Sequence, residues 1–261
     1  MNDYYVDDRG LAMFFETHWL DVLRDHGNQS VLESKSRHVS DRFIISNHFN
    51  EVAQSINNSL LINNIHPQKL LEVGSSLGRS SYEMIKAHDG IKNVTAVEPS
   101  QAFMITYKDI LLKGHKIDFT YIKSRQQLGH ITFDSSPIAK VCADVKFELI
   151  NKEFDSHTVD EQFDLVVCLN VLDQCPSPNT IVNALKHSVK VGGVLCLSCT
   201  YQWNKKHLLD PSEAVNDIND YFEENQWKCL SQHEHDYKFR FSERFSRLFS
   251  AHLVVYQKLD V

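Results

Sequence analysis

Apolar residues recur at helical spacing in two segments that precede the first predicted strand. The segments are residues 11–22 and 49–60, and both follow the i, i+3, i+4, i+7 pattern of a helix with one apolar face. The residues of this pattern are Leu11, Phe14, Phe15, His18, Trp19 and Val22, then Phe49, Val52, Ala53, Ile56 and Leu60. We expect residues 1–66 to form a helical cap that acts as a lid over a ligand site.

From residue 67 onward, short apolar runs alternate with helical segments. The alternation predicts an α/β fold in a domain of residues 67–261: a Rossmann-like, doubly wound, mostly parallel sheet of seven strands. Residues 114–137 depart from the alternation and are typical of a hairpin inserted at the edge of the sheet. The predicted strands span residues 70–73, 94–97, 141–144, 163–169, 194–198, 227–230 and 252–256.

Composition narrows the possible partners. The 261 residues carry a net charge of −7 and no basic run, so we expect no nucleic-acid partner. No apolar stretch is long enough to cross a bilayer, so we expect no membrane partner and a cytoplasmic location. Three of the six cysteines lie inside apolar strand-like runs, so reduced thiols and no metal site are expected; these are Cys168, Cys196 and Cys199. The sequence does not indicate an oligomeric state.

The turn after the first strand carries the main functional signal. The string E-V-G-S-S-L-G, residues 72–78, places two glycines between a strand and a helix, which suits a nucleotide-like ligand. Glu98 ends the next strand about 20 residues later, where an acid reaches ribose hydroxyls. Glu72 would repel a pyrophosphate but suits an ammonium group, which favours S-adenosylmethionine over a dinucleotide. The predicted cofactor-binding residues here are Glu72, Gly74, Ser75, Ser76, Gly78, Arg79, Glu98 and Pro99.

Further residues are predicted to complete the cofactor site. Asp144 ends the predicted strand at residues 141–144, where its carboxylate would accept the adenine amino group, with Val145 beside it. An Asp in this position is also a common turn residue. Phe103 would lie against adenine, and a core position in its own helix is an equal alternative.

The strand at residues 163–169 leads to the predicted reaction site. Asn170 directly follows the strand and Asp173 comes three residues later, at the edge of the sheet where ligands of such folds bind. Both residue types also form turns. Tyr201 and Trp203 follow the next strand, where they would contact the substrate as aromatic walls or pack a lid. Asp173, Asn170 and Tyr201 are the predicted catalytic residues.

Several strings resemble known methyltransferases. The pattern from Glu72 onward resembles the class I S-adenosylmethionine-dependent methyltransferases. The strings at residues 72–83, 170–173 (N-V-L-D), 192–198 and 201–203 (Y-Q-W) resemble the methyltransferase domain of ovothiol synthases, which methylates the imidazole of a mercaptohistidine. C-L-N-V-L-D-Q-C, residues 168–175, is similar to a string in enzymes that methylate histidine in proteins.

This resemblance implies transfer of a methyl group from S-adenosylmethionine to an imidazole nitrogen of a small molecule. The chain has no room for the iron-dependent sulfoxide synthase half of the bifunctional enzymes, so we expect sulfur insertion to need another protein. Toward the C-terminus the match is limited to Asp236, Phe239 and Glu243. The alternatives are methyl transfer to a phenol, carboxylate or amine, a noncatalytic S-adenosylmethionine-binding protein, and a dehydrogenase.

Overall fold

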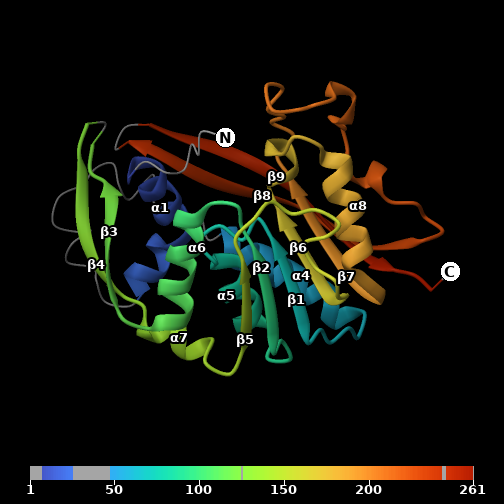
Figure 1. Ribbon diagram of the computed structural model, residues 1–261, viewed down its shortest axis with the longest axis horizontal. Helices are drawn as coiled ribbons and strands as arrows, with labels where there is room; N and C mark the ends of the chain where they lie inside the picture. The colour runs from blue at the N-terminus through green and yellow to red at the C-terminus, as the bar shows by residue number, and fades with distance from the viewer. Residues whose placement is uncertain (1–7, 26–47, 125, 243–244, 261) are drawn as a thin grey trace.

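A seven-stranded sheet forms the centre of the protein (Figure 1). The computed structural model describes residues 8–25, 48–124, 126–242 and 245–260. The strand order is β5-β2-β1-β6-β7-β9-β8; all pairs from β5 to β7 are parallel, and the last two pairs are antiparallel. The strands are β1 (Lys69–Val73), β2 (Asn93–Val97), β5 (Lys146–Ile150), β6 (Phe163–Leu169), β7 (Val189–Cys199), β8 (Trp227–Ser242) and β9 (Phe245–Lys258).

Helices cover both faces of this sheet, which confirms the predicted doubly wound, Rossmann-like architecture. Successive strand residues point to opposite faces, so Leu70 and Leu71 belong to two different apolar cores. The core with Leu70 includes side chains of α1 (Asp8–Asp25), α4 (His48–Ile62), α5 (Arg79–Ala87) and α6 (Gln101–Lys108). The core with Leu71 includes side chains of α8 (Pro178–Ser188) and of the short turn η4 (Ile218–Tyr221).

The strand order places several loops at one edge of the sheet. From β1 the chain moves outward through β2 to β5, then returns to β6 on the other side of β1. Such a reversal separates the loops that follow the two central strands and leaves a crevice for ligands. The predicted site residues after β1, β2, β6 and β7 therefore share one edge.

The segment 114–137 contains a hairpin that is separate from the main sheet. Its strands, β3 (Lys116–Ile122) and β4 (Leu128–Asp134), pair only with each other, so the expected insertion at the sheet edge is wrong. The hairpin instead packs on α1, where the Phe15 and Phe119 rings stack at 3.8 Å between centroids. Figure 1 shows this hairpin beside α1, away from the main sheet.

The strand predicted at residues 141–144 is also wrong. Residues 136–141 form a short helix, α7 (Ser136–Val141), and Asp144 lies in the turn before β5. The remaining short elements are η1 (Asp109–Lys113), η2 (Leu172–Gln174) and η3 (Pro211–Glu213).

Two buried histidines predict that the fold is sensitive to acid. Burial, together with Arg79 and His48, lowers the pKa of His18 to about 3, and burial, together with His235, lowers the pKa of His48 to about 3. Both are protonated near pH 6.5 in the unfolded chain, so the fold loses stability as the pH falls from 6.5 toward 3. We expect the free energy of unfolding to be about 2 kcal/mol lower per histidine at pH 5 than at pH 7, measured by denaturant titration. His18→Gln should remove its share, whereas a His130→Gln variant, exposed on β4, should keep the full loss.

Candidate functional site

The turn between β1 and α5 needs both of its glycines. Gly74 and Gly78 have φ angles of 72° and 78°, in the left-handed region that favours glycine. A side chain at Gly78 would come within 2.6 Å of the buried Tyr107 ring, and one at Gly74 would overlap Val171. The backbone of the turn at Gly74 therefore lies directly against Val171, which follows β6.

Glu98 closes this turn from the end of β2. Its two carboxylate oxygens accept hydrogen bonds from the backbone N–H groups of Ser76 and Ser100, both at 2.9 Å. The carbonyl groups of Glu98 and Pro99 accept from the Asn151 side chain at 2.8 and 3.1 Å. Asn151, which follows β5, was not predicted, because its strand was not recognised.

Three polar side-chain groups in β1 and in the turn after it are buried. Glu72 is 3% exposed and accepts a hydrogen bond from the Ser81 hydroxyl. Burial raises the pKa of Glu72 to about 7, although that hydrogen bond acts in the opposite direction. The hydroxyl oxygens of Ser75 and Ser76 are buried and have no hydrogen-bond partner among the described residues. Since buried hydroxyls are normally paired, the turn has capacity for a polar ligand.

Arg79 contributes to the attachment of α1. Its guanidinium donates to the two carboxylate oxygens of Asp21, at 2.5 and 2.7 Å, and to Glu83 at 2.9 Å. Trp19 of α1 also donates from its indole nitrogen to the carbonyl oxygen of Leu77, at 3.1 Å. These two acids occupy the guanidinium of Arg79, and Asp21 fixes α1 against the turn; the predicted role of Arg79 in binding the cofactor remains a prediction.

Asn170 and Asp173 lie where the sequence places them, past the carboxyl end of β6. Asn170 has a φ of 55° and is fixed to Ser198 of β7, whose hydroxyl donates to its side-chain oxygen at 3.0 Å. Asp173 is 3% exposed, and one of its oxygens, Oδ2, accepts from the Thr200 hydroxyl. Its other oxygen, Oδ1, is buried without a hydrogen-bond partner among the described residues. Burial raises the pKa of this carboxyl group.

The structure places the two predicted adenine contacts, Phe103 and Asp144, in different parts of the molecule. Phe103 is buried in the first turn of α6, and its ring lies 4.8 Å from that of Phe14 on α1. Asp144 and Val145 precede β5, so they lie at the opposite end of this strand from Asn151 and the site. Their predicted contact with adenine is wrong, because the strand begins where we expected it to end.

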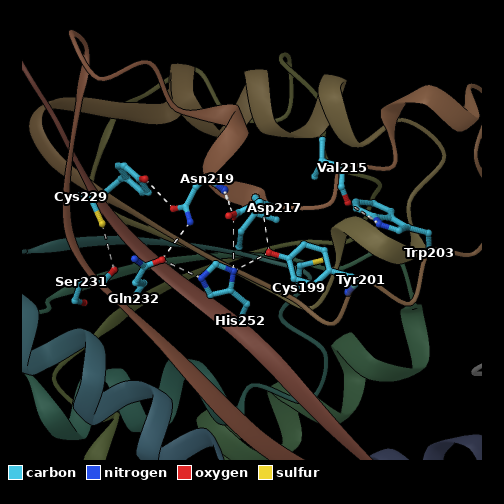
Figure 2. A network of polar contacts seen from close by, with 12 residues as sticks. Cys199, Tyr201, Trp203, Val215, Asp217, Asn219, Cys229, Ser231, Gln232 and His252 are labelled. Atoms are coloured by element: carbon cyan, nitrogen blue, oxygen red, sulfur yellow. Dashed lines mark hydrogen bonds and ion pairs between the residues drawn. The ribbon is translucent and has the colours of Figure 1, made fainter.

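Tyr201 and Trp203 are directed into a polar network on the neighbouring part of the sheet (Figure 2). The Tyr201 hydroxyl lies 2.7 Å from Nδ1 of His252 and accepts from the Ile218 N–H at 3.1 Å. Burial raises the pKa of this hydroxyl to about 12. The indole nitrogen of Trp203 donates to the carbonyl oxygen of Val215 at 3.0 Å. These contacts fix the loop after β7; the predicted substrate contacts of Tyr201 and Trp203, and the predicted catalytic role of Tyr201, remain predictions.

Tyr237 of β8, which the sequence pattern does not single out, lies on the part of the β8–β9 hairpin that runs past the end of β7. Its ring lies 4.8 Å from the ring of His48. Burial is the main cause that raises the pKa of its hydroxyl, and the charge of Asp173 also contributes.

In the described ranges, no group of three or more His, Cys, Asp or Glu side chains is arranged to hold a metal ion. None of the helices in these ranges has the length and apolar character required to cross a bilayer.

Part of the chain is similar in sequence to known methyltransferases. The chain is 34% identical over 75 residues to the ubiquinone biosynthesis O-methyltransferase of Hydrogenovibrio crunogenus, and 35% identical over 66 residues to that of Pseudomonas entomophila. The matched segments are 29% and 25% of this chain and cover only 31% and 28% of the two relatives. No family model matches the chain.

Two solved structures share the fold over most of the chain. Magnesium protoporphyrin IX methyltransferase from Synechocystis PCC 6803, with bound S-adenosylhomocysteine, has a TM-score of 0.53 at 14% identity; the match covers 97% of this chain and 100% of that protein. The N-methyltransferase NodS from Bradyrhizobium japonicum WM9, also with S-adenosylhomocysteine, has a TM-score of 0.52 at 10% identity, covering 89% and 98%. At these identities the comparison shows a shared fold.

Proposed function

We propose that this protein is an S-adenosylmethionine-dependent methyltransferase that acts on a small molecule. The observation that carries the proposal is the turn itself, where Glu98 closes the backbone and the buried Ser75 and Ser76 hydroxyls have no hydrogen-bond partner in the part of the chain that the structure describes. The names of the matched relatives and of the structural neighbours support methyl transfer. An acid at the position of Glu72 suits the amino-acid end of this cofactor better than a pyrophosphate.

Each element of the turn has a role in this proposal. Glu98 would accept hydrogen bonds from the two ribose hydroxyls, and Glu72 would accept from the ammonium group, directly or through water. Gly74 and Gly78 allow the backbone to approach, and Phe103 would pack against the adenine. When bound, the cofactor supplies an electrophilic methyl group; the protein supplies position and exclusion of water.

The proposed acceptor is an imidazole nitrogen. The reference pKa of imidazole, near 6.5, leaves most molecules neutral at pH 7, so attack on the methyl group needs no strong base. Asp173 Oδ1 would accept the N–H on the far side of the ring, which selects the tautomer and stabilises the positive charge that develops. Asn170, already oriented by Ser198, would help to orient the ring.

The proposal is tested by donor binding and by transfer. Calorimetry with S-adenosylhomocysteine should show binding to the folded protein, and trideuteriomethyl S-adenosylmethionine incubated with a metabolite extract should yield a labelled product that mass spectrometry identifies. A labelled imidazole supports the full proposal, whereas a labelled phenol supports methyl transfer and contradicts the acceptor. Binding without transfer to any compound would favour a noncatalytic protein, and no binding would contradict the cofactor.

Donor binding should release a proton from Glu72. Because burial raises the pKa of Glu72 to about 7, much of it is protonated at pH 6, and a bound ammonium group favours the ionised form. Affinity for S-adenosylhomocysteine should therefore rise up to about tenfold per unit from pH 5 to 7 and level off above. Calorimetry at pH 6 in two buffers with different ionisation enthalpies measures the released proton. Glu72→Gln should abolish the release; an equal release from this variant would assign the proton to another group.

A further inference from the structure

The β8–β9 hairpin continues past the carboxyl edge of the sheet. β7 ends at Cys199, which pairs with His252 of β9, so residues 245–251 of β9 and their partners in β8 extend beyond the end of β7. Tyr237 pairs with Phe249, three residues past His252, which is about 10 Å beyond β7 at the usual rise of a strand. Figure 1 shows both strands running on from the sheet toward α1 and the β3–β4 hairpin. The extension thus passes the same edge of the sheet, formed by the carboxyl ends of the strands, at which Asp173 lies.

One face of this extension is aromatic and is turned toward the N-terminal helices. Alternate residues of β8 share a face, and His235, Tyr237 and Phe239 all contact rings of α1 or α4. Phe14 of α1 lies 5.0 Å from Phe239 and 4.8 Å from Phe103 of α6, measured between ring centroids. The aromatic face therefore forms a continuous wall from the hairpin to the proposed adenine contact.

Tyr237 is the residue of this face whose hydroxyl is influenced by the charge of Asp173. Its ring packs between His48, at 4.8 Å, and Phe249, stacked at 5.1 Å, which fixes its orientation. The Asp173 carboxylate lies within electrostatic reach, since its charge helps to raise the pKa of the Tyr237 hydroxyl. Asp173 Oδ1 is buried and lacks a hydrogen-bond partner among the described residues. A buried carboxylate oxygen without a donor favours a ligand that brings one.

We propose that Tyr237 is a positioning residue for the methyl acceptor, and that this acceptor is a small aromatic ring bearing an N–H or O–H group. The ring would lie against the half-buried members of the aromatic face, Tyr237 and Phe239, with its donor on Asp173 Oδ1 and the Tyr237 hydroxyl as a second polar contact. This inference rests on the proposed methyl transfer. It adds the residue and the surface that select the acceptor.

The test compares two tyrosine variants from the same hairpin. Tyr237→Phe keeps the ring and removes the hydroxyl proposed to contact the acceptor. Tyr256→Phe removes a hydroxyl that donates to Asn219 at 2.8 Å, in the network of Figure 2. Acceptors are offered as a panel of histidine, a mercaptohistidine, catechol, an aliphatic amine and an aliphatic carboxylate, together with a metabolite extract, and trideuteriomethyl S-adenosylmethionine is the donor.

We expect the wild-type protein to label an aromatic acceptor. For that acceptor, Tyr237→Phe should raise KM at least about tenfold, while KM for the donor and affinity for S-adenosylhomocysteine stay within about twofold. Tyr256→Phe should resemble the wild type in all three values. A purely structural role for Tyr237 would change the donor values or lower the thermal midpoint as well.

The outcomes separate this inference from the function on which it rests. Unchanged acceptor KM in Tyr237→Phe, or a labelled aliphatic amine or carboxylate, overturns the inference and leaves methyl transfer intact. Absence of transfer by the wild-type protein overturns the proposed function, and this inference with it.

Discussion

Replacing Asp173 by asparagine should lower turnover about 10²-fold or more while affinity for S-adenosylmethionine changes little. Asp173 Oδ1 is buried and has no hydrogen-bond partner within the described ranges, so in the proposed mechanism it accepts the acceptor's N–H and stabilises the charge that develops on the ring. An asparagine side chain can keep the bond to Thr200 through its oxygen, but it then presents an NH2 group to that N–H. Steady-state kinetics with the acceptor identified by mass spectrometry measures the loss.

The pH dependence of turnover provides a second readout on Asp173. Burial raises the pKa of this carboxyl group, and the proposed role needs the ionised form. Turnover of the wild-type protein should therefore fall as the pH drops through that pKa; the residual turnover of Asp173→Asn should lack this fall and keep only the one caused by protonation of the acceptor imidazole. The matched control is Asp160→Asn, at an exposed position before β6. Wild-type turnover in Asp173→Asn would eliminate the proposed role.

The parts of the site that could be predicted are those set by local pattern and by strand order. Glu72, Glu98 and Asn170 end or follow short apolar runs that are buried on both faces of the sheet, so the runs are easy to recognise as strands. Once these strands are parallel neighbours, their carboxyl ends must meet at one edge. The glycine turn follows from the same reasoning, because it joins a strand directly to a helix.

Asp144 shows why an edge strand is harder to predict. Val141, Cys142 and Ala143 resemble a short strand, but Val141 ends helix α7 and the other two lie in the turn after it; the apolar run of α7 is too brief to show a helical period. The true strand, β5, has the sequence K-F-E-L-I and lies at the edge of the sheet, where polar residues alternate with partly buried ones. The error moved the expected adenine contact to the wrong end of the strand.

The direction of the Tyr201 side chain and the position of Tyr237 depend on contacts between residues that are far apart in the sequence. The direction of Tyr201 follows from a backbone φ of 57° after β7, which carries its side chain toward His252. The position of Tyr237 follows from the pairing of β8 with β9 beyond the end of β7, in a polar segment that reads Q-H-E-H-D-Y-K. Long-range pairing decides both positions, and a short-range hydrophobic pattern does not specify it.

Replacing Glu98 by glutamine should weaken donor binding about 10²-fold, with a smaller effect on turnover at saturating donor. Two hydrogen bonds from ribose hydroxyls to an ionised carboxylate are each worth about 1.5 kcal/mol or more, and together they correspond to about two orders of magnitude in Kd. The carboxylate also holds the N–H groups of Ser76 and Ser100, and an amide retains only one oxygen for these contacts.

Calorimetry with S-adenosylhomocysteine measures this loss, and Glu148→Gln is the matched control. Glu148 lies on β5, the neighbour of β2, but its side chain is exposed and away from the turn. The control should bind and unfold like the wild type, whereas Glu98→Gln, which loses one hydrogen bond to a turn N–H group, should unfold at a somewhat lower temperature and still be folded during the titration. A change in Kd of less than about threefold for Glu98→Gln, in a folded protein, would mean that Glu98 only stabilises the turn and that other groups bind the ribose.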